Sequence, residues 1–210
     1  MCNLYEYDMT AEDMRLLQEH YRLIGIEFSE AMRVPNAPRQ VYPNYEAPVV
    51  LDRDGARVVE TMRWGFPPPP FVKSKAPVTN VRNVDKGFWK PYLGRASRCV
   101  VLATAFSEFD QAQRRPRWFK RPDGKPFFFA GIYRSWEGDR GTKAKPNVGT
   151  HALYSFLTTE PNAVVAPIHP KAMPVLLLDP AAVEQWLTGS DADALALQKP
   201  TPDDAIKLAA

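Results

Sequence analysis

Proline is the residue that most limits what this chain can fold into. The sequence holds 21 prolines in 210 residues, about twice the usual share of ~5%. Proline lacks a backbone N–H and is confined to turns, to strand edges and to the ends of helices. We therefore expect many strands, turns and loops, and only short helices.

The rest of the composition is typical of a folded, water-soluble protein. Hydrophobic residues make up 45% of the chain and charged residues 24%. The apolar runs are all shorter than the ~20 residues that cross a bilayer, so we expect no membrane association. A chain of this length can bury a substantial core, which excludes a disordered chain and a small disulfide scaffold.

The two cysteines, Cys2 and Cys99, are too few for a disulfide framework and lack the spacing of a zinc or redox motif. No basic segment followed by an apolar one opens the sequence, so no secretory signal is predicted. We expect a cytoplasmic protein in a reducing compartment.

Two helices are predicted from apolar spacing and end signals. The first follows Thr10 and ends at Gly25. The second begins at Asp179-Pro180, an N-cap with proline in the first turn, and ends at Gly189. Residues 26–48 read as a long surface loop.

Apolar, β-branched runs between turn residues predict the strands. They cover residues 49–52, 57–64, 98–106, 117–120, 126–132, 152–158 and 175–178. Turns at Arg53-Asp54-Gly55 and at Pro122-Asp123-Gly124 predict two hairpins, the second joining 117–120 to 126–132. The four prolines of 67–70 predict an extended connector or a cleft wall.

The connections between these strands are mostly too short for parallel βαβ units. We therefore predict an α+β fold with a single domain over residues 1–210. Its core is a curved, largely antiparallel, barrel-like sheet flanked by helices, and 189–210 form a tail of mixed structure.

Charge is distributed unevenly along the chain. Residues 63–125 carry 14 lysines and arginines against 4 acidic residues, a net charge of +10 in a chain whose total is +3. Ordinary solvated surface charge is one explanation. The size of the asymmetry favours an anionic partner, and nucleic acid also suits the aromatic residues of this segment, such as Trp64 and Trp118.

Cys2 is notable for its position. If Met1 is removed, Cys2 carries an α-amine and a thiol on adjacent carbons. The amine, with a pKa near ~8, can add to an aldehyde to give a Schiff base, and the thiol can then close on that carbon to give a thiazolidine. The alternative is a cysteine of no consequence near a frayed terminus.

The other polar candidates are Asn80, Arg82, Glu108 and His169. Glu108 follows the apolar run 98–106, so we expect it at a strand end. His169 lies in a proline-bracketed loop that can fix its direction. The histidines have no metal-ligand spacing, so neither a metal nor a cofactor is predicted, and Cys99 reads as a small buried hydrophobe.

Several short motifs together resemble one known family. They are Met1-Cys2, Arg63-Trp64-Gly65, Thr79-Asn80-Val81-Arg82, Arg98-Cys99, Phe106-Ser107-Glu108-Phe109, Phe129-Ala130-Gly131, Thr158-Thr159-Glu160, Ala166-Pro167-Ile168-His169 and Met173-Pro174. In this order, over about residues 1–188, they resemble the SRAP family, the SOS response-associated peptidases. The chain departs from the family pattern at Asn3-Leu4 and at Val41-Tyr42-Pro43-Asn44-Tyr45.

The resemblance implies an α+β fold with a positively charged cleft and a role in the DNA damage response. Members bind single-stranded DNA and crosslink to abasic sites through the N-terminal cysteine. Cys2 would then form the thiazolidine, Glu108 carry protons, His169 assist at the sugar, and Asn80 hold Cys2 or the sugar in place. A monomer in the cytoplasm, associated with the nucleoid when bound to DNA, is expected.

The resemblance also implies DNA contacts. Arg63, Arg82, Arg98 and Lys171 would meet phosphates, and Trp64 would pack against a base or sugar or support the cleft.

Two alternatives remain open from the sequence. One is a thiol peptidase with Cys2 as nucleophile, His169 as base and Asn80 or Glu108 as orienting group, acting on Met1 of its own chain. The other is a non-covalent single-stranded DNA module in which Cys2 is incidental.

Overall fold

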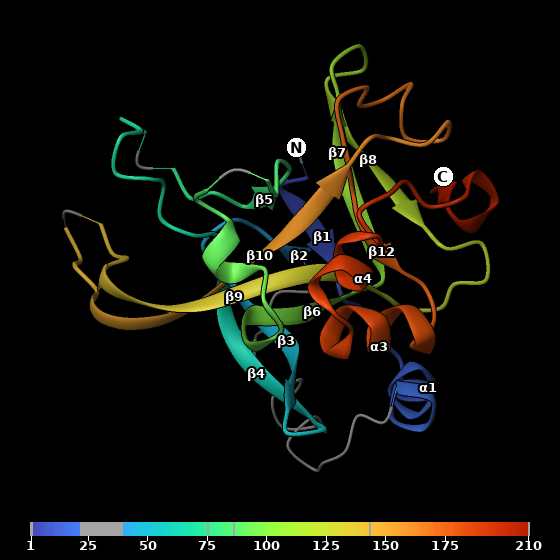
Figure 1. Cartoon of the computed structure of the whole chain (residues 1–210). Coiled ribbons are helices and arrows are strands. Elements are labelled where there is room, and N and C mark those ends of the chain that lie inside the picture. Colours follow the sequence, from blue (N-terminus) through green and yellow to red (C-terminus); the bar gives the residue numbers. More distant parts are fainter. Residues whose placement is uncertain (1, 22–39, 75, 86, 143, 210) are drawn as a thin grey trace.

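Five strands close a small barrel at the centre of the protein (Figure 1). They are β3 (Glu46–Arg53), β4 (Ala56–Trp64), β6 (Arg98–Ala103), β9 (Phe127–Asp139) and β10 (Val148–Thr159). Around the ring, β10 pairs with β4, β4 with β3, β3 with β6, β6 with β9, and β9 with β10. An odd number of strands cannot alternate in direction around a closed ring, so one pair must be parallel, and this pair is β4 with β10. The structure describes residues 2–21, 40–74, 76–85, 87–142 and 144–209.

The side chains of β9 show how the barrel divides the core, because successive residues of a strand point to opposite faces. Phe127 and Phe129 belong to the cluster that fills the barrel and receives side chains from all five strands. Phe128, Ala130 and Ile132 belong to a second cluster, between the barrel and the helices.

A second sheet lies against the mouth of the barrel. Its strands run in the order β13 (Lys207–Leu208), β8 (Arg115–Lys120), β7 (Ala105–Asp110), β1 (Leu4–Glu6) and β2 (Gln40–Val41), all antiparallel. Three short strands, β5 (Asn80–Val81), β11 (Met173–Pro174) and β12 (Leu176–Leu177), extend the barrel sheet.

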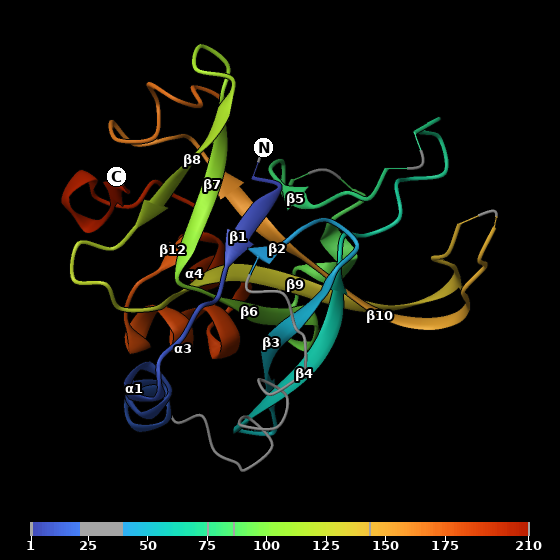
Figure 2. The same cartoon turned by 180° about the vertical axis from the view of Figure 1, so that it is seen from behind.

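The helices α1 (Ala11–Tyr21), α3 (Pro180–Thr188) and α4 (Asp191–Leu195) gather on the side of the barrel away from the N-terminus (Figures 1 and 2). The prediction for α3 is confirmed: the Asp179 carboxylate accepts the N–H of Ala182, and Gly189 is the C-cap. Three short 3₁₀ turns complete the elements, at Lys90–Tyr92, Arg95–Ser97 and Asp203–Ala205.

The predicted α+β class with a curved, largely antiparallel, barrel-like sheet is confirmed. So is the hairpin at Arg53-Asp54-Gly55, which joins β3 to β4. Of the first predicted helix, residues 11–21 are helical, and its end at Gly25 lies outside the described residues, as does 26–39 of the predicted loop. The remainder of that loop is wrong, because 40–48 contains β2 and the start of β3.

Three strand predictions are corrected. The run 98–106 is two strands in different sheets, because the chain leaves the barrel at Thr104. Residues 117–120 and 126–132 form no hairpin: β8 pairs with β7 and β13, whereas β9 pairs within the barrel sheet. The predicted strand 175–178 is β12 alone, with β11 just before it.

No helix in the described part of the chain is long and apolar enough to cross a membrane.

Arg98 ties the barrel to α3 from within. Its side chain is fully buried, and its guanidinium donates to the carbonyl oxygens of Leu93 at 2.8 Å, Trp186 at 3.2 Å and Gly189 at 2.8 Å, and to the Asp191 carboxylate. The carbonyls of Trp186 and Gly189, at the end of α3, lack partners within the helix, and the cation satisfies them.

Arg98→Met is expected to lower the free energy of unfolding by about 3 kcal/mol, because several buried oxygens lose their donor. The matched control is Arg95→Met, whose side chain is 57% exposed and whose loss should cost less than about 1 kcal/mol. Urea unfolding measures both, and equal midpoints for the two variants would contradict this role for Arg98.

Candidate active site around Cys2

The N-terminal strand places Cys2 inside the protein. β1 lies between β2 and β7, with Tyr5 opposite Val41 and Phe106. The Tyr5 side chain enters the barrel, where its hydroxyl lies 2.6 Å from that of Tyr154. Because Tyr5 is fixed, Cys2 three residues earlier is held at the barrel mouth, and it is fully buried.

Asn80 reaches Cys2 from β5, a strand that pairs with β10. At Gly65 the chain leaves β4, and β5 continues the parallel pairing with β10. Gly65 has φ +109°, and an added Cβ would lie 2.5 Å from Pro77, so only glycine suits this bend. The Asn80 Nδ2 donates to the carbonyl oxygen of Cys2 at 2.9 Å.

Glu108 lies inside β7 and not at a strand end, which corrects the prediction. It is 2% exposed, and the neighbouring Ser107 pairs with Leu4 of β1. Burial raises the pKa of Glu108 to about 7. Burial, and next the charge of Glu108, raise the pKa of the Cys2 thiol well above its usual range.

His169 comes from the loop 160–172 between β10 and β11, which lies beside the β7–β8 ribbon (Figures 1 and 2). Its Nδ1 lies 3.0 Å from the carbonyl oxygen and 3.2 Å from the nitrogen of Ala172. Its Nε2 lies 3.8 Å from Oε2 of Glu108. Burial lowers the pKa of His169, so the imidazole is largely neutral at neutral pH.

The structure thus brings together the four residues that the sequence singled out as catalytic. The Cys2 carbonyl oxygen accepts a hydrogen bond from Asn80, and the charge of Glu108 raises the pKa of the Cys2 thiol. Glu108 in turn faces His169. A carboxyl group that titrates near neutral pH, beside a neutral imidazole, can donate and accept protons. The raised pKa of the thiol disfavours a thiolate at rest.

The residues predicted to contact DNA differ in their exposure. Arg98 cannot meet a phosphate, because it is buried beneath α3. Trp64 cannot stack on a base either: it is fully buried, donates its indole N–H to Thr79, and supports the site from below. Arg63 is bonded to Asn44 and Glu46, and Arg82 to Glu160, both with part of the side chain exposed. Lys171 is exposed beside His169.

Ion pairs reduce the positive charge of residues 63–125. Six of their arginines are paired with carboxylates: Arg63, Arg82, Arg95, Arg98, Arg117 and Arg121. The positively charged cleft is therefore still a prediction.

Sequence reasoning missed a pair of exposed tyrosines near the site. Tyr42 and Tyr45 are 42% and 46% exposed, and their rings lie edge to face at 5.6 Å. They flank Asn44, which receives hydrogen bonds from Arg63 and Arg140. The signal was present in the sequence as the departure from the family pattern at 41–45.

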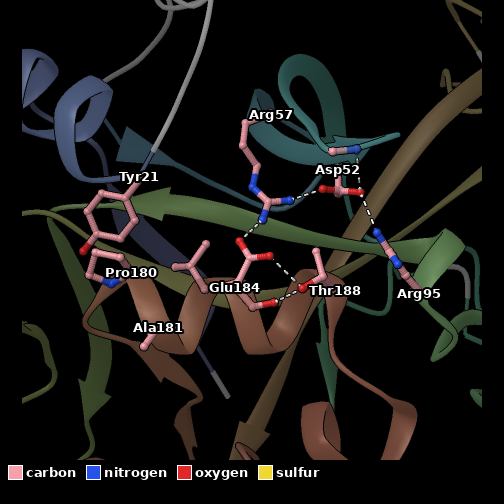
Figure 3. Close-up of a pocket in the computed structure, with 10 residues that line it drawn as sticks. Tyr21, Asp52, Arg57, Arg95, Pro180, Ala181, Glu184 and Thr188 are labelled. Atoms are coloured by element: carbon pink, nitrogen blue, oxygen red, sulfur yellow. Dashed lines mark hydrogen bonds and ion pairs between the residues drawn. The ribbon is translucent and has the colours of Figure 1, made fainter.

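A cavity of about 710 Å³ lies at the opposite pole, between α3 and the β3–β4 hairpin (Figure 3). Its charged groups are bound to one another: Arg57 donates to Asp52 and Glu184, and Arg95 donates to Asp52 at 3.2 Å. This network joins the hairpin to α3, and the residues that line the cavity include none of Cys2, Asn80, Glu108 and His169.

Comparison with known proteins gives one family. The model of the SOS response associated peptidase (SRAP) family matches residues 1–210. The abasic site processing protein HMCES of Pongo abelii is 29% identical over 208 residues, covering 76% of this chain and 56% of that protein. The abasic site processing protein YoqW of Bacillus subtilis is 28% identical over 169 residues, covering 75% of this chain and 70% of that protein. The chain spans little more than half the length of the HMCES relatives it matches.

Solved structures share the fold. A Bordetella bronchiseptica protein superposes with a TM-score of 0.74 at 21% identity, covering 99% of this chain and 98% of that one. A Bacteroides thetaiotaomicron protein gives the same TM-score at 22% identity, covering 99% and 90%.

Glu108→Gln is expected to remove a pH dependence of stability. The folded pKa of about 7 lies above the ordinary 4.5, so the contribution of Glu108 to stability is fully present below the unfolded value. Up to about 3 kcal/mol of this contribution is lost as the pH rises through the folded value. Glutamine cannot ionise and should escape this loss. Urea unfolding at about pH 5 and about pH 8 measures it.

The control for this measurement is Glu12→Gln on the exposed face of α1, which should keep the wild-type profile. Parallel profiles for wild type and Glu108→Gln would mean that the Glu108 carboxyl is not held protonated by burial.

Proposed function

The chain belongs to the SOS response-associated peptidase (SRAP) family, and on that premise we propose that it processes abasic sites in single-stranded DNA by bonding to them covalently through Cys2. The convergence of Asn80, Glu108 and His169 on a buried cysteine next to the chain terminus carries this proposal. The HMCES and YoqW relatives are named abasic site processing proteins, which supports abasic sites as the target.

The reaction begins once hydrolysis of the Met1–Cys2 bond has freed the Cys2 α-amine. The amine adds to the C1′ aldehyde of the ring-opened sugar, and the carbinolamine loses one water to give an imine. The thiol then adds across the C=N bond, sulfur to carbon and proton to nitrogen, which closes the thiazolidine. Because the imine is consumed, β-elimination cannot proceed and the DNA strand stays intact.

The site residues supply the proton transfers and the orientation. Glu108, with its pKa near neutral pH, can protonate the departing hydroxyl and accept a proton from the attacking groups. His169 is placed to assist at the sugar hydroxyl, and Asn80 fixes the Cys2 carbonyl and with it the direction of the nucleophiles.

The chemistry of the thiol argues against a general peptidase. A thiolate nucleophile needs a lowered pKa, whereas burial raises that of Cys2. Aldehyde capture starts from the amine and needs the thiol only as an S–H that adds to the imine.

Cys2→Ser is expected to abolish a stable adduct with a single-stranded oligonucleotide that holds one abasic site. Intact-mass spectrometry after denaturation, without a reductant, should find protein lacking Met1 joined to DNA with loss of one water in the wild type. No such species should form in the variant, because serine cannot close a stable ring.

Cys99→Ala is the matched control for Cys2→Ser, since Cys99 is equally buried but lies in β6. It should retain the adduct. A stable adduct in Cys2→Ser would assign the capture to another amine and overturn the role of Cys2.

The DNA strand beside the lesion is proposed to pass over Tyr42 and Tyr45. Both rings are partly exposed, and they follow β2, which pairs with Tyr5 and Glu6 of β1. Arg63 and Arg140 both donate to Asn44, which lies between the two tyrosines in the chain, and they are the proposed cations for the DNA backbone. Aromatic faces with neighbouring cations are the usual elements of single-strand binding.

Replacing both Tyr42 and Tyr45 by alanine should weaken binding of an undamaged single-stranded oligonucleotide by about tenfold or more, since each stacked base is worth roughly 1–3 kcal/mol. Fluorescence anisotropy measures the affinity. Phe109→Ala, at a similarly exposed aromatic residue of β7 (47%), is the control and should bind as the wild type does. Equal affinities for all three proteins would remove the tyrosines from the interface.

A further inference from the structure

Glu108 of β7 lies directly opposite a cation, Arg117, on the neighbouring strand β8. In the antiparallel β7–β8 ribbon, Phe106 is opposite Phe119, Glu108 opposite Arg117, and Asp110 opposite Arg115. The Phe106 and Phe119 rings stack at 5.2 Å within the barrel cluster. Every second residue shares a face, so Glu108 and Arg117 project from the same inward face of the ribbon.

The Arg117 side chain is paired with a different carboxylate. Directly opposed residues in an antiparallel pair have Cβ atoms about 4.5–5.5 Å apart, so Arg117 and Glu108 are natural partners. The ion pair instead joins Arg117 Nη1 to Asp110 Oδ2 at 3.6 Å, and only 17% and 7% of the two side chains are exposed. The cation is therefore drawn diagonally toward the turn that ends the ribbon.

Asp110 is itself held by that turn. Its Oδ1 accepts the backbone N–H groups of Ala112 at 2.9 Å and Gln113 at 3.0 Å. Two main-chain donors fix the carboxylate at the end of the ribbon, so it offers Arg117 a rigid partner away from the site.

We propose that Asp110 is a positioning residue for this site, holding the Arg117 guanidinium at the turn and so keeping a positive charge off Glu108. Its effect on Glu108 is independent of DNA. Its effect on catalysis rests on the proposed function.

The position of the Arg117 guanidinium matters because Glu108 is surrounded by other titratable groups of the site. The Cys2 thiol faces it from the segment before β1, and the His169 imidazole from the loop 160–172. The charge of the N-terminal amine acts to lower its pKa. Arg117 and Asp110 flank it on the ribbon. An opposite charge at about 4–6 Å lowers a carboxyl pKa by roughly 1–3 units. An Arg117 turned toward Glu108 would thus leave it ionised at neutral pH and unable to donate a proton.

The test is the titration of Glu108 itself, followed by ¹³C NMR of glutamate side-chain carbonyls and assigned with Glu108→Gln. In Asp110→Asn, which keeps an oxygen for the turn N–H groups, the pKa of Glu108 should fall by at least about one unit. In Arg117→Gln it should stay or rise.

The double variant Asp110→Asn/Arg117→Gln separates Arg117 from the direct effect of removing the Asp110 charge. The fall caused by Asp110→Asn should be clearly smaller when Arg117 is absent. Asp123→Asn removes a carboxylate from another arginine pair, Arg121–Asp123, and should leave Glu108 unchanged. An unchanged pKa in Asp110→Asn, or an equal fall with and without Arg117, would overturn the proposal.

Crosslinking to an abasic oligonucleotide adds a second readout. The alkaline limb of its pH–rate profile should move down in Asp110→Asn by the same amount as the NMR pKa, and return in the double variant. Absence of crosslinking in every protein would count against the proposed function, while the titration would still decide the role of Asp110.

Discussion

The burial of Tyr5 inside the barrel is the contact on which the site depends. Its ring packs edge-on against Trp64, Phe129 and Phe156, and its hydroxyl meets that of Tyr154. A chain terminus is ordinarily the most mobile part of a domain. Here only two residues separate Cys2 from Tyr5, whose side chain is fixed by aromatic packing, and β1 is paired on both edges. The N-terminal residues can therefore serve as a site whose groups must be held within about 0.5 Å of a productive geometry.

The burial of Glu108 and Cys2 determines which protonation states the site favours. Removing the carboxyl of Glu108 and the thiol of Cys2 from water disfavours the ionised form of each, which raises both pKa values. Glu108 is thereby shifted to a range in which it can exchange protons at neutral pH, while the thiol keeps its proton. A site intended for a thiolate would need positive charge or a helix N-terminus beside the sulfur. The observed environment suits an amine that reacts first and a thiol that follows.

Local sequence signals predicted the elements that have local causes. The N-cap of Asp179 with Pro180, and the turn at Asp54-Gly55, determine α3 and the β3–β4 hairpin through neighbouring residues. The order of the motifs also identified Cys2, Asn80, Glu108 and His169, which the fold brings together. The break at Thr104 could not be predicted, because 98–106 is continuously apolar and only tertiary pairing decides that β6 and β7 join different sheets. The place of Glu108 inside β7 was missed for the same reason.

Arginine shows why composition alone misjudges a binding surface. Net charge along the sequence counts each guanidinium equally. Arg98, however, donates its hydrogen bonds to the carbonyl oxygens at the end of α3. Arg57 donates to carboxylates that join the β3–β4 hairpin to the same helix. Long side chains with several donors are suited to such internal roles. What a nucleic acid can meet is the subset whose side chains still reach solvent, together with the aromatic rings beside them. In this chain Trp64 and Arg98 are buried, whereas Tyr42 and Tyr45 are exposed in the turn that follows β2, the strand paired with β1.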